Sequence, residues 1–153
     1  MKKLIGIIAI LTIIFIYGCS KQPSSIKAKQ DGKPLIVMYG DFKCPYCKKV
    51  EDKVMPKLRN KYIDKNKVKF QYVNLAFIGK DSIIGSRAQQ AVNHYAPKYS
   101  LQFQKLMFEH QKDEDKKWIT HTLIDKQIDK LNISNKTKDK ICLLYTSPSP
   151  RDV

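Results

Sequence analysis

The apolar positions after residue 33 follow patterns that predict two strands. Residues 34–39, PLIVMY, form a compact apolar run with β-branched members, typical of a buried strand that ends at Gly40 and Asp41. Residues 68–77, VKFQYVNLAF, alternate apolar and polar side chains and then become mixed, which favours a second strand. The first strand leads directly into the sequence CPYC at residues 44–47.

A helix is predicted between the two strands. Val50, Val54 and Leu58 recur at the spacing of one helical face. Pro45 suits the first turn of this helix, whereas Pro56 requires a kink. Strand, helix and strand in this order indicate a parallel α/β unit, with CPYC at the N-terminus of its helix.

Residues 80–141 have the pattern of a block of helices. Asp81 is a predicted N-cap for the first of them. The apolar face that follows consists of Ile84, Ala88, Ala91, Val92 and Tyr95. Residues 101–110 and 118–131 show the same period and predict further helices.

The first 19 residues predict an export signal. Lys2 and Lys3 precede an apolar run over residues 4–16, as in the charged and apolar regions of a secretory signal peptide. This run is shorter than the roughly 20 residues that a helix needs to cross a bilayer. A permanent transmembrane anchor is therefore the weaker alternative.

Residues 16–19, IYGC, resemble the lipobox of bacterial lipoproteins, in which cleavage before the cysteine leaves a lipidated N-terminus, here Cys19. Tyr17 departs from the small residue usual at its position. The polar residues 20–32, SKQPSSIKAKQDG, predict a flexible tether. We therefore expect a lipid-anchored protein on the extracytoplasmic face of a bacterial cell membrane.

The formal net charge is +15, yet only three of the 29 basic residues are arginines. Arginine is preferred for bidentate reading of phosphates and bases. The lysines are spread along the chain, usually beside Asp, Asn or Gln. The composition therefore argues against nucleic-acid binding and suits loose attraction to an anionic envelope or membrane.

The pair Cys44 and Cys47 has the spacing and position of a redox site. The nucleophile of disulfide exchange is a thiolate, which a helix N-terminus stabilises through its dipole and free N–H groups. Cys44 has that position, and Lys43, Lys48 and Lys49 add positive charge nearby. Cys47, one turn deeper, can close back on Cys44 and release a mixed disulfide. We therefore predict that Cys44 attacks and Cys47 resolves.

Two other interpretations of the pair stay open on the residues alone. A structural zinc site usually has four ligands, and neither a second CxxC nor a close histidine pair accompanies this one. His94, His110 and His121 are scattered over predicted helices and are interpreted as surface residues. The pair could also be two inert buried thiols, although an exported chain would oxidise them. We predict no bound metal.

The sequence DFKCPYC after an apolar strand, with a helix behind it and a long helical block later, resembles the DsbA-like thiol:disulfide oxidoreductases of the thioredoxin superfamily. The resemblance covers residues 33–141. It implies an α/β fold of the thioredoxin type, in which residues 33–79 form the first part of the domain and residues 80–141 a helical insertion.

The same resemblance implies an oxidase that introduces disulfides into unfolded or reduced exported proteins with free thiols, without a cofactor. Cys44 would be the nucleophile, Cys47 the resolving thiol, and Pro45 with Tyr46 the dipeptide that tunes the redox potential. The agent that re-oxidises the pair is left open between a membrane quinone reductase and small-molecule oxidants.

Two alternative functions share the motif. CPYC also occurs in glutaredoxins, which are cytosolic reductases, but the export signal and the helical block argue against that assignment. The other alternative is a non-enzymatic lipoprotein that binds a metal or a partner through the thiols.

Residues 142–153, CLLYTSPSPRDV, differ from the rest of the chain, because they lack lysine and contain two Ser-Pro steps. They resemble a translated sequencing adapter, so we predict that the natural frame ends near Ile141 and that Cys142 has no function. The family places a cis-proline loop, further strands and a last helix after the helical block. Without them we expect a two-stranded sheet with an open edge, in a fragment that folds poorly or is inactive.

Overall fold

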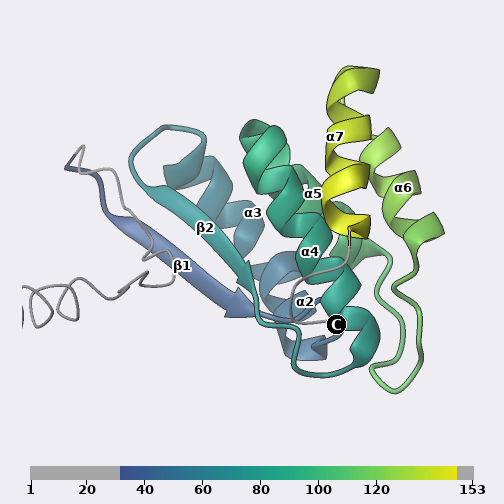
Figure 1. The fold of residues 1–153 in the computed structure, drawn as a ribbon. Helices are drawn as coiled ribbons and strands as arrows, with labels where there is room; N and C mark the ends of the chain where they lie inside the picture. Colours follow the sequence, from purple (N-terminus) through teal and green to yellow (C-terminus); the bar gives the residue numbers. More distant parts are fainter. Residues whose placement is uncertain (1–31, 148–153) are drawn as a thin grey trace, which may run out of the picture. The chain divides into compact units, whose positions relative to one another are not determined.

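Two parallel strands form the sheet in the computed structural model of this chain, which describes residues 32–147. Strand β1 (Leu35–Gly40) pairs with β2 (Lys69–Asn74), and Figure 1 shows them side by side. The second strand stops short of the predicted residue 77. There the Asn74 side chain accepts a hydrogen bond from the N–H of Ala76, which has a left-handed φ of 53°. The predicted strand, helix and strand order is confirmed.

The connection between the strands is helical but interrupted. It comprises α2 (Pro45–Lys53), α3 (Met55–Leu58) and a π-helical turn, η1 (Arg59–Ile63). Pro56 lies in the first turn of α3, where a missing N–H costs no helical hydrogen bond. The kink that Pro56 predicted is therefore present as a break at Val54.

The apolar spacing that predicted this helix does not mark its buried side. Val50 and Val54 are exposed, the latter by 52%. Glu51 and Met55 face inward instead. A charged residue therefore enters the interior directly behind the CPYC sequence, and its partners are described with the site.

The helical block contains four α-helices and a 3₁₀ turn within the described residues. They are α4 (Lys80–Tyr95), η2 (Pro97–Tyr99), α5 (Ser100–Glu109), α6 (His121–Asp129) and α7 (Asn135–Thr146). Helices α4 and α7 lie side by side, with α5 and α6 next to them (Figure 1).

Two predicted helix starts are wrong. Gly79, not Asp81, is the N-cap of α4, and Asp81 lies in its first turn with its carboxylate turned to other segments. Residues 118–120 precede α6 instead of belonging to it, because the Thr120 side chain caps the helix by accepting a hydrogen bond from the N–H of Leu123.

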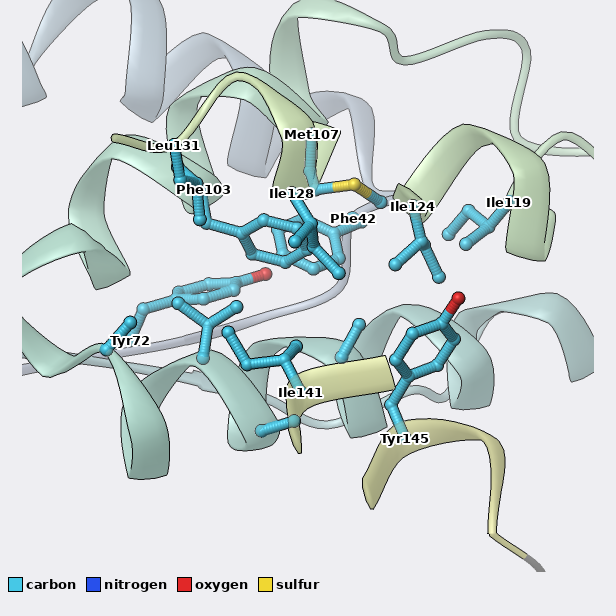
Figure 2. Close-up of a cluster of buried hydrophobic side chains, with 14 of the residues drawn as sticks. Phe42, Tyr72, Phe103, Met107, Ile119, Ile124, Ile128, Leu131, Ile141 and Tyr145 are labelled. Carbon is cyan, nitrogen blue, oxygen red and sulfur yellow. The ribbon is translucent and has the colours of Figure 1, made fainter. Parts of the chain in front are cut away.

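Aromatic side chains from the strands and the helical block meet in one core. Phe42, which follows β1, has its ring centroid 5.4 Å from that of Tyr72 on β2 and 5.2 Å from that of Phe108 on α5. Figure 2 shows Phe42 and Tyr72 beside the apolar side chains of α6 and α7. The labelled members from those two helices are Ile124, Ile128, Ile141 and Tyr145. The residues around CPYC are thus anchored directly on the helical block.

Helix α7 runs past Ile141 to Thr146, into the segment predicted to be foreign. Tyr145 in that segment is buried, and its hydroxyl donates a hydrogen bond of 2.6 Å to Asp125. The origin of residues 142–153 stays a prediction. The predicted signal peptide, Cys19 and all of the predicted tether except residue 32 lie outside the described residues. Within residues 32–147, none of the helices is long and apolar enough to cross a bilayer.

Candidate redox site

Cys44 begins helix α2 as its N-cap. Its backbone is extended (φ −70°, ψ 117°), and its sulfur accepts a hydrogen bond of 3.4 Å from the N–H of Cys47. Its own N–H donates to the carbonyl oxygen of Asp41 at 3.0 Å. Pro45 follows in the first turn of the helix, as predicted. The Cys44 sulfur therefore lies where the N–H groups and dipole of a helix favour a negative charge.

Cys47 lies one turn later and packs against the core. A Cβ atom added to Gly40 would lie 2.9 Å from the Cys47 sulfur and 3.2 Å from the Tyr72 ring, so only glycine leaves this sulfur its space. Burial raises the pKa of the Cys47 thiol to about 11, and the neighbouring Cys44 adds to the rise. At neutral pH the free Cys47 is thus a protonated thiol.

Pro45 and Tyr46 lie on the solvent side of the pair. The Tyr46 side chain is 72% exposed, and the Lys49 ammonium lies 4.9 Å from the centre of its ring. The structure therefore brings together all four residues of the predicted site on one turn. The dipeptide faces outward and Cys47 faces inward.

The positive charge expected beside Cys44 is only partly available. Lys43 is buried, with 4% of its surface exposed, and its ammonium forms an ion pair of 3.0 Å with Asp81. The expectation that Lys43 adds net positive charge at the site is therefore wrong. Lys48 lies 3.1 Å from Asp52 on the surface of the same helix. The helix N-terminus therefore remains as a source of positive potential at Cys44.

Asp81 joins three segments beneath the site. Besides Lys43, it accepts hydrogen bonds from the N–H groups of Trp118 and Ile119 at 3.0 and 3.1 Å. Burial disfavours its charged form, but these hydrogen bonds outweigh that cost and hold its pKa below the ordinary value. The charged Asp81 side chain therefore connects α4 with Lys43, the residue before Cys44, and with the segment that leads into α6.

The family model described as thioredoxin matches residues 26–146. The chain belongs to the thioredoxin family.

The names of two curated relatives of this chain refer to disulfide bond formation. The chain is 34% identical over 115 residues to a probable disulfide bond formation protein D of Bacillus cereus, covering 72% of this chain and 53% of that protein. It is 36% identical over 109 residues to disulfide bond formation protein D of Bacillus subtilis, covering 69% and 49%. The chain thus spans about half the length of these curated relatives.

Solved structures agree with this assignment. The oxidised BdbD of Bacillus subtilis matches with a TM-score of 0.63 and 32% identity, over 74% of this chain and 62% of that one. The DsbA of Chlamydia trachomatis matches with a TM-score of 0.60 over 81% and 72%, and at 17% identity it supports the fold alone. The predicted resemblance to DsbA-like proteins with a thioredoxin-like fold is confirmed.

Gln111 holds the redox loop, residues 41–47, through side-chain hydrogen bonds that the sequence did not predict. This residue follows α5, and its side-chain amide donates hydrogen bonds to the carbonyl oxygens of Phe42 at 2.6 Å and Cys44 at 3.0 Å. No local pattern marks Gln111, because its role depends on a contact across 67 residues of sequence.

Asp41 and Glu51 were also missed, and both are buried carboxylates of the thioredoxin-family domain. Asp41 accepts hydrogen bonds from the N–H groups of Lys43 and Ile78 and from the Ser82 hydroxyl, at 2.8 to 2.9 Å. The cue for Asp41 in the sequence was its place at the end of a buried strand.

Glu51 connects α2 with α5. Its carboxylate accepts hydrogen bonds from Arg59 and Gln104, each at 2.7 Å, and Arg59 also donates to the carbonyl oxygen of Leu101 at 3.1 Å. Burial nevertheless raises the pKa of Glu51, because these partners offset only part of the lost hydration.

A hollow of about 810 Å³ opens beside the pair. It is lined by Pro45 and by residues 111–118, which include six consecutive charged side chains, KDEDKK. The exposed side of the redox turn therefore borders a polar and charged surface.

The other predicted features do not join the site. His94 and His121 are exposed as predicted, while His110 is half-buried with Nδ1 3.2 Å from the carbonyl oxygen of Leu106. Across residues 32–147, no three Cys, His, Asp or Glu side chains gather in a way that could hold a metal ion. Cys142 lies on α7, where its thiol donates a hydrogen bond of 3.6 Å to the carboxylate of Asp125.

Proposed function

We propose that this chain is a thiol:disulfide oxidoreductase that oxidises substrate thiols through Cys44 and Cys47. One observation carries the proposal: the Cys44 sulfur accepts the Cys47 N–H at the start of α2, while Cys47 packs behind it against the core. A nucleophile at a helix N-terminus with a second thiol one turn deeper is the arrangement that disulfide exchange requires. The naming of the relatives as disulfide bond formation proteins supports the same chemistry.

In the oxidase direction, a substrate thiolate attacks the sulfur of Cys44 in the Cys44–Cys47 disulfide. The bond between the two cysteines breaks, its electron pair leaves on Cys47, and a mixed disulfide forms with Cys44. A second substrate thiolate then attacks the substrate sulfur of that mixed disulfide and releases Cys44. The substrate loses two electrons and gains a disulfide, and the pair ends as two thiols without any cofactor. Pro45 and Tyr46, between the two sulfurs, tune the redox potential.

The proposed substrates are reduced or unfolded exported proteins with free thiols. The signal-like residues 1–19 support export, and Cys19 would carry the lipid that anchors the protein on the extracytoplasmic face of the bacterial cell membrane. A compartment outside the cytoplasm is also where disulfides persist.

Trapping of mixed disulfides tests the assignment of roles. The full chain, with Cys19 and Cys142 replaced by serine, is incubated with an unfolded protein that carries a non-native disulfide. The Cys47→Ser variant should accumulate a covalent complex on non-reducing gels, because Cys44 attacks and nothing resolves the product. The Cys44→Ser variant should not. Absence of a complex with either variant would favour a binding protein over an enzyme.

Equilibration of the pair with glutathione buffers tests the direction of the reaction. We expect a potential well above the value of about −270 mV that characterises the reductase thioredoxin. A value at or below that level would assign the chain as a reductase while leaving the exchange chemistry in place.

A further inference from the structure

The hydroxyl of Tyr72 is buried without a hydrogen-bond partner in the described part of the chain. Tyr72 is only 2% exposed, and its ring packs against Phe42 and Phe108 at centroid distances of 5.4 and 5.8 Å. Figure 2 shows the hydroxyl directed into the buried cluster. A phenylalanine would supply the same packing without burying an unpaired polar atom, so this hydroxyl requires an explanation.

The same hydroxyl lies close to the redox pair. A Cβ atom on Gly40 would be 3.3 Å from the Tyr72 hydroxyl oxygen and 2.9 Å from the Cys47 sulfur, so both atoms lie against one face of this glycine. The pairing of β1 with β2 brings Tyr72 close to Gly40. In this register Tyr72 lies opposite Met38, two residues before Gly40, and Gly40 lies opposite Asn74. Burial raises the pKa of Tyr72 far above its usual range, and the nearby Cys47 raises it further. The hydroxyl therefore keeps its proton and is a permanent donor.

Cys47 needs a donor at one moment of the proposed reaction. When the disulfide opens, this sulfur leaves with the electron pair as a thiolate, in surroundings whose low polarity raises its pKa to about 11. A backbone hydrogen bond from Asp41 opposes that rise. A leaving thiolate departs faster when its charge is stabilised, because the rate of exchange depends on the leaving group.

We propose that the Tyr72 hydroxyl donates a hydrogen bond to the Cys47 thiolate that is released when a substrate thiolate attacks Cys44. This inference rests on the proposed exchange function. The hydrogen bond forms as charge develops on the Cys47 sulfur and stabilises the transition state for breaking the Cys44–Cys47 bond. The Tyr72 proton is not transferred, so the electron balance of the exchange is unchanged.

The test compares Tyr72→Phe with Tyr99→Phe in the oxidised full chain. Tyr99 is a matched control, because it is a partly buried tyrosine packed on the same core but located in η2. A short peptide with one reduced cysteine is mixed with each protein, samples are quenched with acid, and free thiols are alkylated and counted over time. Loss of a hydrogen bond to a charged group predicts that disulfide opening slows about tenfold in Tyr72→Phe. We expect the rate of Tyr99→Phe to equal that of the wild type.

Thermal unfolding separates this role from a structural one. Because the hydroxyl has no partner in the folded state, Tyr72→Phe should unfold at the wild-type temperature or slightly above it. A wild-type rate of disulfide opening in a folded Tyr72→Phe protein would overturn the inference. Failure of the wild-type chain itself to oxidise the peptide would instead overturn the proposed function.

A second substitution covers the case in which Tyr72→Phe does not fold. Site-specific 3-fluorotyrosine at position 72 keeps nearly the same shape but makes the hydroxyl a stronger donor. The disulfide should then open faster than in the wild type. An unchanged rate would contradict the role of Tyr72.

Discussion

At the scale of single residues, the absence of a side chain at Gly40 leaves the space that Cys47 and Tyr72 occupy beside the redox pair. Cys47 and Tyr72 both press against the face of Gly40 that a side chain would occupy. In most strands an alanine in place of glycine is neutral or favourable, because glycine loses more conformational freedom on folding. Here the contacts reverse that preference.

We predict that Gly40→Ala destabilises the fold by about 1–3 kcal/mol, the usual cost of forcing an extra methyl into a packed interior. The new Cβ would lie 2.9 Å from the Cys47 sulfur, so that sulfur or the Tyr72 ring must move. Urea unfolding of the single variant measures the cost. In a Cys47→Ala background the sulfur is absent, and most of the penalty should disappear. An equal penalty in both backgrounds would assign the strain to the Tyr72 ring alone.

Single residues also show where sequence reasoning ends. Cys44, Pro45, Tyr46 and Cys47 could be identified because their spacing and their place after an apolar strand are local properties. The need for glycine at position 40 could not, since it depends on a tyrosine 32 residues later that strand pairing brings alongside. Local patterns thus locate the reactive atoms but not the residues that shape their surroundings.

At the scale of elements, buried carboxylates connect the redox helix with the helical block. Glu51 joins α2 to α5 through Gln104, and Asp81 joins α4 to Lys43. Helical periodicity predicted these helices, but the prediction of Asp81 as an N-cap was wrong. An acidic residue is common both at the N-cap and in the first turn of a helix, so the sequence does not distinguish the two positions. The connections themselves require knowledge of which helices are neighbours.

We predict that Asp81 makes the protein sensitive to acid. Its pKa is lowered in the folded state, so it contributes stability that is fully present above the ordinary value of 3.8 and is lost as the pH falls below it. Asp81→Asn should lose about 3–5 kcal/mol at pH 7, because Lys43 would stay buried without its partner. Its free energy of unfolding should then fall less than that of the wild type on acidification below pH 3.8. Urea unfolding at a series of pH values measures both effects.

Glu51→Gln is the matched control for that experiment, because folding shifts the pKa of Glu51 upward, whereas it shifts the pKa of Asp81 downward. Its pKa is raised in the folded state, so its contribution to stability weakens as the pH rises above the ordinary value of 4.5. The free energy of unfolding of Glu51→Gln should therefore fall more steeply than that of the wild type as the pH is lowered towards 4.5. Parallel pH profiles for the wild type and both variants would contradict the assignment of these two carboxylates.

At the scale of the whole molecule, the described residues hold together through a core that the sheet alone could not provide. A sheet of two strands is marginal in water. Phe42 and Tyr72 instead pack with α5, and the core continues through α4, α6 and α7. The sequence did not reveal this continuity, because hydrophobic periods predict single elements and do not show which elements of residues 33–79 pack against those of residues 80–141. The redox loop is therefore tied to the helical block by packing as well as by Gln111 and Asp81.

This continuity predicts that the redox site and the helical block unfold together. Cys47 packs against the same core as Trp118, which lies in the segment before α6. In a Cys44→Ser variant, which cannot form the disulfide, alkylation of Cys47 should begin at the urea concentration at which Trp118 fluorescence changes. Mass spectrometry of peptides distinguishes Cys47 from the other cysteines, and Cys142 on α7 serves as the internal reference. If Cys47 became reactive while Trp118 fluorescence was still native, the redox loop would open independently, and the ties through Phe42, Gln111 and Asp81 would be too weak to couple the two regions.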